Sequence, residues 1–204
     1  MGEAKAPRWN LERFYPGFDS PEYRSALERL RSQIAELREA VELSGAWLSE
    51  AVDRLNAALA TAESLESFAY TTYSTNTSDS EALRQLDQLS ELMVGLQDGR
   101  VRLRSRLAGE ADSLRELRQP GGALGAYAHI LEEEITFAGY QMEVAEENLA
   151  ADLNRSGGEL WSRLQESVSS ELSTIWSEET GKRKSVTELR ALAFHPDRSV
   201  RERA

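Results

Sequence analysis

Leucines recur at spacings of three, four and seven along one stretch of the chain, residues 80–118. These spacings place apolar side chains on one face of an α-helix, and the repeat consists of Leu83, Leu86, Leu89, Met93, Leu96, Leu103, Leu107, Leu114 and Leu117. A helix of this length would extend roughly 58 Å, which is more than a compact domain of this size needs to span. We therefore expect other helices to cover its apolar face.

Both ends of this expected helix are marked. Ser78 and Glu81 have the spacing of a capping box at its start, and Pro120-Gly121-Gly122 cannot continue it at its end. Gly95 and Gly99 lie in its interior, where a glycine costs about 1 kcal/mol relative to alanine, so we expect close packing or a bend there. Arg100 occupies a place where the repeat requires an apolar residue, which predicts a shift of the apolar seam at this point.

Two more long helices come before it, so that residues 20–118 form three. The first begins at Ser20 with Pro21 in its first turn and ends before Gly45; its apolar face carries Tyr23, Leu27, Leu30, Ile34, Leu37 and Val41. The second runs from about 46 to 73. Since only residues 74–79 join it to the third, these two helices must form an antiparallel hairpin.

The segments on either side of these helices have different compositions. Residues 1–19 are predicted to be an irregular strap that buries its aromatic side chains on the helices, namely Trp9, Phe14, Tyr15 and Phe18. Residues 123–204 predict shorter helices at about 123–137, 144–154 and 159–171, with a break at 155–158. A small β-hairpin is expected near 172–187, and Ser185 with Glu188 forms a capping box that opens a last helix.

The predicted fold class is therefore all-α, with one helical domain spanning residues 1–204. A long antiparallel helical hairpin packs with an N-terminal helix and several shorter helices. The last eight residues, 197–204, read as a helix cut off after two turns, so we interpret the chain as a fragment of a longer protein.

Composition excludes several classes of function. The 204 residues include no cysteine, which rules out disulfides, thiolate nucleophiles and thiolate metal sites. The net charge of −11 argues against broad contact with nucleic acid or anionic membrane. No signal peptide and no long apolar run is present, so we expect a soluble cytoplasmic protein. A row of four arginines is expected to form a solvated face or intrahelical ion pairs: Arg100, Arg102, Arg104 and Arg106.

No catalytic, cofactor-binding or metal-binding residue is predicted in this chain. His129 and His195 are its only histidines, and neither stands in a His-Glu-x-x-His or Glu-x-x-His motif. His129 shares a helix face with Glu132 and Glu133, which we interpret as surface residues. Ser156-Gly157-Gly158 lacks the lysine of a phosphate-binding loop. The glutamate clusters at 132–134, 146–147 and 178–179 are interpreted as solvated.

Four segments in order resemble the N-terminal region of the oligoendopeptidase F family of zinc metallopeptidases. The opening 9–21 is similar to its aromatic Leu-Tyr-Pro-like start, and 70–79 to its Tyr-rich segment that runs into a Thr-Ser-Asp turn. Residues 156–164 resemble its glycine turn followed by a Trp-containing helix, and 197–204 its Asp-Arg-x-Val-Arg-x-x-Ala stretch. The segment 123–151 is less typical of the family.

This resemblance implies the function that we expect. The full-length protein would be a zinc metalloendopeptidase that hydrolyses short peptides, zinc polarising the scissile carbonyl while a glutamate activates water. The family's His-Glu-x-x-His motif has no counterpart here, so this chain should be inactive alone and form part of the substrate-channel wall. Its partners would be the C-terminal catalytic domain of the same polypeptide and the oligopeptide substrate.

A second class of function stays open at this point. A helical hairpin can also be a scaffold or adaptor that binds a partner along its apolar face. An N-terminal peptidase domain predicts an exposed apolar patch near the end of the chain and an open reading frame that continues to a His-Glu-x-x-His motif. An adaptor predicts a frame that stops after Ala204.

Overall fold

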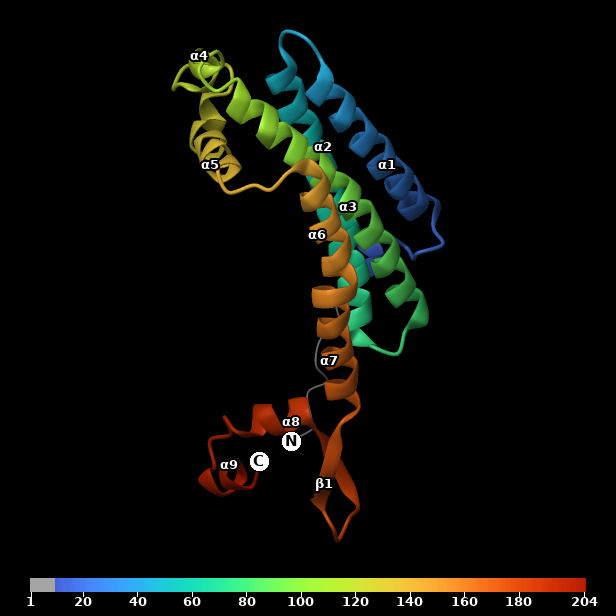
Figure 1. Cartoon of the computed structure of the whole chain (residues 1–204). Helices are drawn as coiled ribbons and strands as arrows, with labels where there is room; N and C mark the ends of the chain where they lie inside the picture. Colours follow the sequence, from blue (N-terminus) through green and yellow to red (C-terminus); the bar gives the residue numbers. More distant parts are fainter. Residues whose placement is uncertain (1–9) are drawn as a thin grey trace. The chain divides into compact units, whose positions relative to one another are not determined.

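The computed structural model describes residues 10–204 and shows a mostly helical chain with one small β-hairpin (Figure 1), which confirms the predicted fold class. The chain divides into two compact units. Unit 1 comprises residues 10–75 and 79–152, and unit 2 comprises residues 76–78 and 153–204. The prediction of a single domain over 1–204 stays a prediction, and the two units are described separately.

Three long helices form the body of unit 1, namely α1 (Pro21–Glu42), α2 (Trp47–Thr75) and α3 (Ser80–Gly109). All three pairs of these helices are in contact, as the predicted antiparallel hairpin and its covering helix require. Their facing sides bury an apolar core whose largest fully buried members are Trp47, Tyr23, Leu30, Leu37, Leu48, Leu65, Leu96 and Leu107. Among the described helices, none has the length and hydropathy needed to cross a membrane.

The first helix begins and ends as its sequence predicts. The Ser20 side chain accepts a hydrogen bond from the Tyr23 amide, and Pro21 occupies the first helical position. The helix ends at Glu42, and Gly45 in the following loop has a φ of 77°, a left-handed conformation that favours glycine.

The third helix is shorter than predicted, since it ends at Gly109 instead of continuing to 118. The Glu110 amide bonds the carbonyls of Arg106 and Ala108, and the chain then turns before the short helix α4 (Arg115–Arg118). Glycine is the weakest helix former after proline, so a turn competes well at position 109. At the start, the N-cap is Asp79, whose carboxylate accepts from the amides of Glu81 and Ala82. The predicted capping box, with Ser78 as the N-cap, was therefore wrong, because the N-cap lies one residue later.

The two interior glycines of α3 permit close packing against α1. A β-carbon at Gly95 would lie 3.3 Å from Ile34 Cγ2, and one at Gly99 would lie 2.6 Å from Leu37 Cδ2. Gly99 thus fills the inward place between Leu96 and Leu103, which explains why Arg100 can occupy the next position. The predicted shift of the apolar seam is therefore small: Gly99 takes the place in the repeat where a leucine would otherwise stand.

The aromatic residues near the start of the described chain pack on α2. The segment begins with a short 3-10 helix, η1 (Leu11–Arg13), and the Tyr15 hydroxyl lies 3.1 Å from Ser64 Oγ. Edge-to-face ring pairs with centroids 5.2 to 5.3 Å apart then connect Tyr15, Phe18, Tyr23 and Phe68.

One aromatic prediction was wrong. Phe14 does not bury its ring, since the side chain is 70% exposed. It follows the 3-10 turn directly, and the next residue, Tyr15, is the one that is buried, at 7% exposed. Phe14 instead borders an apolar hollow beside α2 that is also lined by Leu11 and Phe68. The predicted burial of Trp9 lies outside the described residues.

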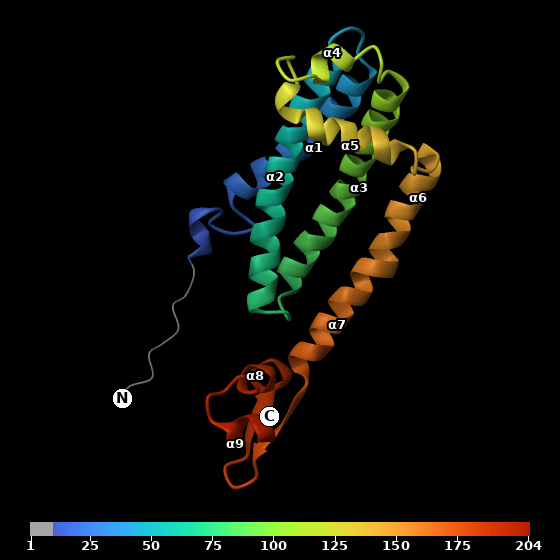
Figure 2. The ribbon, with the colours of Figure 1, turned by 90° about the vertical axis from the view of Figure 1, so that its left-hand side faces the viewer.

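Shorter helices complete unit 1. A 3-10 turn, η2 (Gly125–Tyr127), leads into α5 (Ala128–Ala138), and α6 (Val144–Asn154) has the predicted bounds. Figure 2 shows α5 crossing α3, with which it is in contact. Leu131 of α5 is buried in the apolar core. The predicted helix from 123 therefore begins later, because Gly122 lies against the carbonyls of Glu116 and Leu117 and is part of a tight turn.

In unit 2 the helical backbone does not break at 155–158. These residues form a π-helical turn, η3 (Arg155–Glu159), that leads directly into α7 (Leu160–Glu171). The predicted break was wrong because two glycines weaken a helix by about 1 kcal/mol each, and the wider π turn accommodates them without a stop.

The remainder of unit 2 follows the sequence prediction. Strands β1 (Ser173–Ser177) and β2 (Lys182–Ser185) pair antiparallel with a register shift between Ile175 and Ser177. The Ser185 and Glu188 capping box is present at the start of α8 (Val186–Leu192), and α9 (Arg198–Arg203) begins at the N-cap Asp197. Among the described residues of unit 2, no side chain is fully buried, so this unit lacks a core of its own.

Candidate functional site

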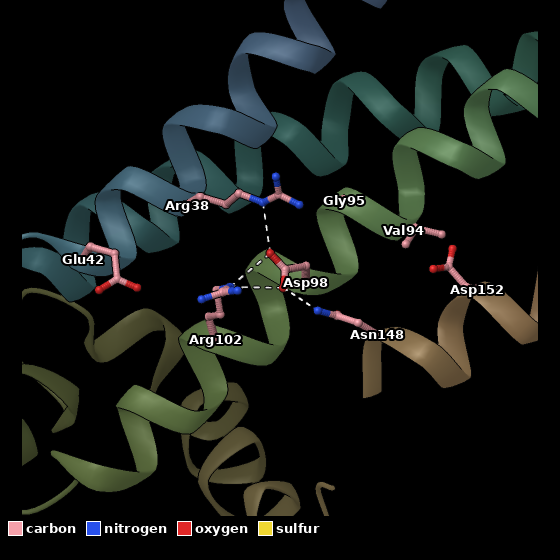
Figure 3. Close-up of a pocket in the computed structure, with 8 residues that line it drawn as sticks. All are labelled: Arg38, Glu42, Val94, Gly95, Asp98, Arg102, Asn148 and Asp152. Carbon is pink, nitrogen blue, oxygen red and sulfur yellow. Dashed lines mark hydrogen bonds and ion pairs between the residues drawn. The ribbon is translucent and has the colours of Figure 1, made fainter. Parts of the chain in front are cut away.

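A polar hollow of unit 1 lies between α1, α3 and α6 (Figure 3). It has a volume of about 570 Å³ and is open to solvent on one side. Three helices from distant parts of the sequence contribute its lining: Arg38, Glu42, Val94, Gly95, Asp98, Arg102, Asn148 and Asp152. We call it the Asp98 cleft.

The close packing of α1 on the interior glycines of α3 positions the residues of the cleft. Arg38 of α1 passes over Gly95, and its Nη2 lies 3.6 Å from where a β-carbon would be, which is an ordinary contact distance. Arg38 then reaches Asp98, which is one turn further along α3. The apolar packing of α1 on α3 therefore sets the position of the charged pair.

Asp98 is the centre of the cleft and receives donors from three helices. Its carboxylate lies 3.0 Å from Arg38 Nε, and Arg102 Nε donates to both of its oxygens at 3.1 Å. Asn148 Nδ2 of α6 donates to Oδ1 at 2.7 Å. The Asp98 side chain is only 9% exposed, whereas Arg38 and Arg102 keep their outer parts in water.

Opposing effects act on the pKa of Asp98. Desolvation by burial is the largest and raises it, because the charged form loses hydration. Hydrogen bonds from Asn148 and Arg102, together with the charges of Arg102 and Arg38, favour the ionised form and outweigh burial. The net result is a pKa below the ordinary value, so Asp98 stays ionised at neutral pH.

The Asp98 carboxylate is not placed to act as a general base. A general base needs a free lone pair directed at the substrate, and the Asp98 carboxylate is occupied by three donors. Glu42 and Asp152 add two carboxylates at the edge of the cleft, and the described residues around it include neither a histidine nor a hydroxyl nucleophile. The cleft therefore offers hydrogen-bonding groups of both charges to a ligand.

The four arginines in the row at 100–106 of α3 are each held by an ion pair. Arg102 and Arg106 pair within the helix, with Asp98 and Glu110 four residues away, as predicted. Arg104 and Arg100 instead reach Glu134 of α5, at 2.6 and 3.6 Å. Arg106 also bonds the carbonyls of Val41 and Leu43 and lies over the Trp47 ring. Arg100, Arg104 and Arg106 thus fasten neighbouring elements to α3, whereas Arg102 pairs within the helix.

The residues considered as a metal site point in different directions. His129 is 86% exposed and lies 3.8 Å from Glu133, whereas Glu132 bonds the buried Arg118 at 2.7 Å. In residues 10–204, no group of three or more histidine, aspartate or glutamate side chains is placed to hold a metal ion. His195 Nδ1 accepts a hydrogen bond from the Asp197 amide and serves the turn before α9.

The other candidate motifs have local structural contacts. The carboxylates of Glu146 and Glu147 accept from the backbone amides of Glu143 and Met142 and so cap the start of α6. Glu178 and Glu179 are exposed in the turn of the β-hairpin. Gly157 and Gly158 belong to the π turn, where they are followed by α7 without a flanking strand.

Sequence reasoning missed the Asp98 cleft. Its one local signal is the four-residue spacing of Asp98 and Arg102 beside an inward-facing glycine, which predicts an ion pair at a helix contact. Nothing in the sequence connects Asp98 to Arg38 or Asn148, because those contacts depend on how α1 and α6 pack on α3.

Comparison with known proteins agrees with the sequence resemblance. Residues 107–173 match a family model described as oligopeptidase F, in its N-terminal domain. The match covers about a third of the chain, from the last turn of α3 to the first residue of β1, and so includes α5, α6 and α7. Neither the curated proteins nor the solved structures contain a significant match to the chain.

Proposed function

We propose, from the premise that residues 107–173 belong to the N-terminal domain of the oligopeptidase F family, that the chain is the non-catalytic domain of a zinc peptidase acting on short peptides. The family match is the observation that carries the proposal. In the full-length protein, a catalytic domain of the same polypeptide would hold zinc and hydrolyse the peptide. The present domain would form part of the wall of the substrate channel, in a cytoplasmic enzyme.

An apolar stripe on α7 supports the proposal that a second domain packs against this chain. Its members recur at spacings of one, three and four and are each between 48 and 69% exposed: Leu160, Trp161, Leu164, Val168 and Leu172. All five lie within the matched residues 107–173. A coreless unit with such a stripe needs a covering surface, and we propose that the catalytic domain supplies it.

The Asp98 cleft supports the channel-wall role. A peptide substrate carries amide donors and carbonyl acceptors along its whole length, together with charged ends. Glu42 and Asp152 can accept from amides or from a peptide ammonium group, and the exposed parts of Arg38 and Arg102 can donate to carbonyls or to a peptide carboxylate. This set of groups suits an oligopeptide and does not depend on its sequence.

Zinc would be bound outside this chain. Structural and catalytic zinc sites take three or four ligands from Cys, His, Asp and Glu, and the described residues do not bring such a set together. We propose that the present residues bind and orient the substrate.

The first test is an activity assay of the purified 204-residue chain with quenched fluorescent peptides of about ten residues and added zinc. We expect no cleavage above buffer. Zinc-dependent hydrolysis that a chelator abolishes would contradict the non-catalytic assignment.

The second test separates the peptidase domain from the adaptor alternative. Translation of the gene downstream of the Ala204 codon should continue in frame to a His-Glu-x-x-His motif. A stop codon directly after Ala204 would favour the adaptor, since the exposed stripe on α7 would then have to bind a different polypeptide.

A further inference from the structure

The helix α6 docks on unit 1 with few apolar contacts. No side chain of this helix, all of which the structure describes, is fully buried. Its inner face consists of half-buried positions at helical spacing, and the only apolar ones are the small residues Val144 and Ala151. Its larger apolar residues, Leu149 and Leu153, are 59 and 60% exposed. Hydrophobic burial therefore contributes little to holding α6 in place.

Polar contacts attach α6 and the segment before it. Asn148 donates to Asp98 at 2.7 Å, and Gln141 Nε2 donates to Ser105 Oγ at 2.6 Å and to the Val101 carbonyl at 3.3 Å. In both amides the oxygen is buried without a hydrogen-bond partner. Docking thus gives the nitrogen of each amide a hydrogen-bond partner but removes water from its oxygen. The net free energy gained by docking is therefore small.

Release of α6 would leave Asp98 well stabilised. Two guanidinium groups, from Arg38 and Arg102, remain within 3.1 Å of its carboxylate when Asn148 is removed. The Asn148 oxygen would regain water at the same time. The contact at Asp98 can therefore open and close without leaving a buried charge unpaired.

Glycines flank the helix on both sides. Gly139 follows α5 and begins the connection to α6, while Gly157 and Gly158 lie in the π turn that comes after it. A β-carbon at Gly157 would meet nothing within 4 Å, so this glycine is not required by packing. Glycine keeps the largest backbone freedom of all residues, which suits both places to a change of backbone angle.

We propose that α6 is a movable wall of the Asp98 cleft, which undocks from α3 while α1, α2 and α3 stay folded. In the docked state Asn148 closes one side of the cleft, as Figure 3 shows. In the undocked state the carboxylate and guanidinium groups of α1 and α3 are accessible from that side. The inference rests on contacts within unit 1 and holds whether or not the proposed peptidase function is correct.

The test is hydrogen exchange of the full 204-residue chain, read by mass spectrometry on peptides from α1, α3 and α6. We expect amides of residues 144–152 to exchange at least 100-fold faster than those of the buried turns of α1. Asn148→Asp should speed exchange in α6 further, by threefold or more, because it places a second carboxylate beside Asp98. It should leave α1 unchanged.

The matched control is Asp152→Asn, one turn further along α6. Asp152 lines the same cleft but has no hydrogen bond or ion pair among the described residues, so this variant should exchange as the original chain does. Protection of α6 within tenfold of α1 would overturn the proposal. So would an Asn148→Asp variant that exchanges faster throughout unit 1, because α6 would then open only when the whole unit unfolds.

Discussion

Gly99 of α3 faces Leu37 of α1 so closely that a β-carbon at position 99 would lie 2.6 Å from Leu37 Cδ2 and 3.1 Å from its Cγ. Leu37 is fully buried among other core side chains and has little room to move. The contact sets how near the two helices come, and the ion pair between Arg38 and Asp98 lies directly beside it.

Gly99→Ala should therefore lower the free energy of unfolding by about 1–2 kcal/mol. Overpacking a core costs about 1–3 kcal/mol, and the better helix propensity of alanine returns up to about 1 kcal/mol of that. Urea denaturation followed by circular dichroism measures the change.

Gly109→Ala is the matched control, because a β-carbon there meets nothing within 4 Å. This substitution should raise stability by about 0.4–1 kcal/mol, through a less flexible unfolded chain. Equal destabilisation by the two substitutions would show that close helix packing is not the reason for Gly99.

The low pKa of Asp98 predicts a pH dependence of stability. A carboxyl whose pKa is lower in the folded state stabilises the fold above its unfolded pKa of about 3.9, and this contribution is lost as the pH falls through the folded pKa. The groups that face it are Arg38, Arg102 and Asn148, with Glu42 and Asp152 further out in the cleft.

Asp98→Asn should remove that part of the dependence. Below pH 4, the free energy of unfolding of the original chain should fall more steeply with decreasing pH than that of the variant. The slopes of free energy against pH should differ by the equivalent of at most one bound proton. Urea midpoints between pH 2.5 and 6 measure both slopes. If the two slopes are equal, the ion pairs at Asp98 do not contribute to folding stability.

Arg118 connects α4 to α5 and to the turn after α3. Its side chain is 7% exposed and donates to Glu132 at 2.7 Å and to the Ala111 carbonyl at 2.6 Å. Arg118→Ala should cost about 2–3 kcal/mol, since it removes charge-assisted hydrogen bonds and a buried aliphatic stem. The thermal unfolding midpoint should fall accordingly.

Glu132→Gln serves as the comparison for Arg118. Glu132 is 66% exposed, so its charge interacts mainly through water and its loss should cost less than about 1 kcal/mol. A larger effect at Glu132 than at Arg118 would mean that the ion pair, and not the buried arginine, stabilises this corner.

The apolar stripe of α7 should bind hydrophobic dyes in the isolated chain. Replacing Trp161 and Leu164 together by serine should reduce the fluorescence of bound anilinonaphthalene sulfonate and change stability by less than about 1 kcal/mol, since both side chains are at least half exposed.

Leu131→Ser in α5 is the opposite case. Leu131 is 4% exposed, so the substitution should destabilise unit 1 by about 2–5 kcal/mol and increase dye binding. A stripe variant that destabilises the chain as strongly as Leu131→Ser would show that α7 is covered in solution.

Local pattern predicted much of this fold. The periodic leucines gave α1, α2 and most of α3, and Ser185 with Glu188 gave a capping box that the structure contains. The errors fall where two local conformations of similar free energy compete. Asp79 caps α3 in place of Ser78, and the glycines at 157 and 158 join a π turn in place of a break.

The amino-acid sequence by itself determined that the chain is helical, that its long helices are amphipathic and antiparallel, and that it resembles one peptidase family, because periodicity, caps and motifs are properties of neighbouring residues. Only the tertiary structure decided that Arg38, Asp98 and Asn148 meet in one cleft and that α6 is held there by polar contacts. Those contacts join residues far apart in the chain, and their energies depend on how closely the helices pack and how much water is excluded between them.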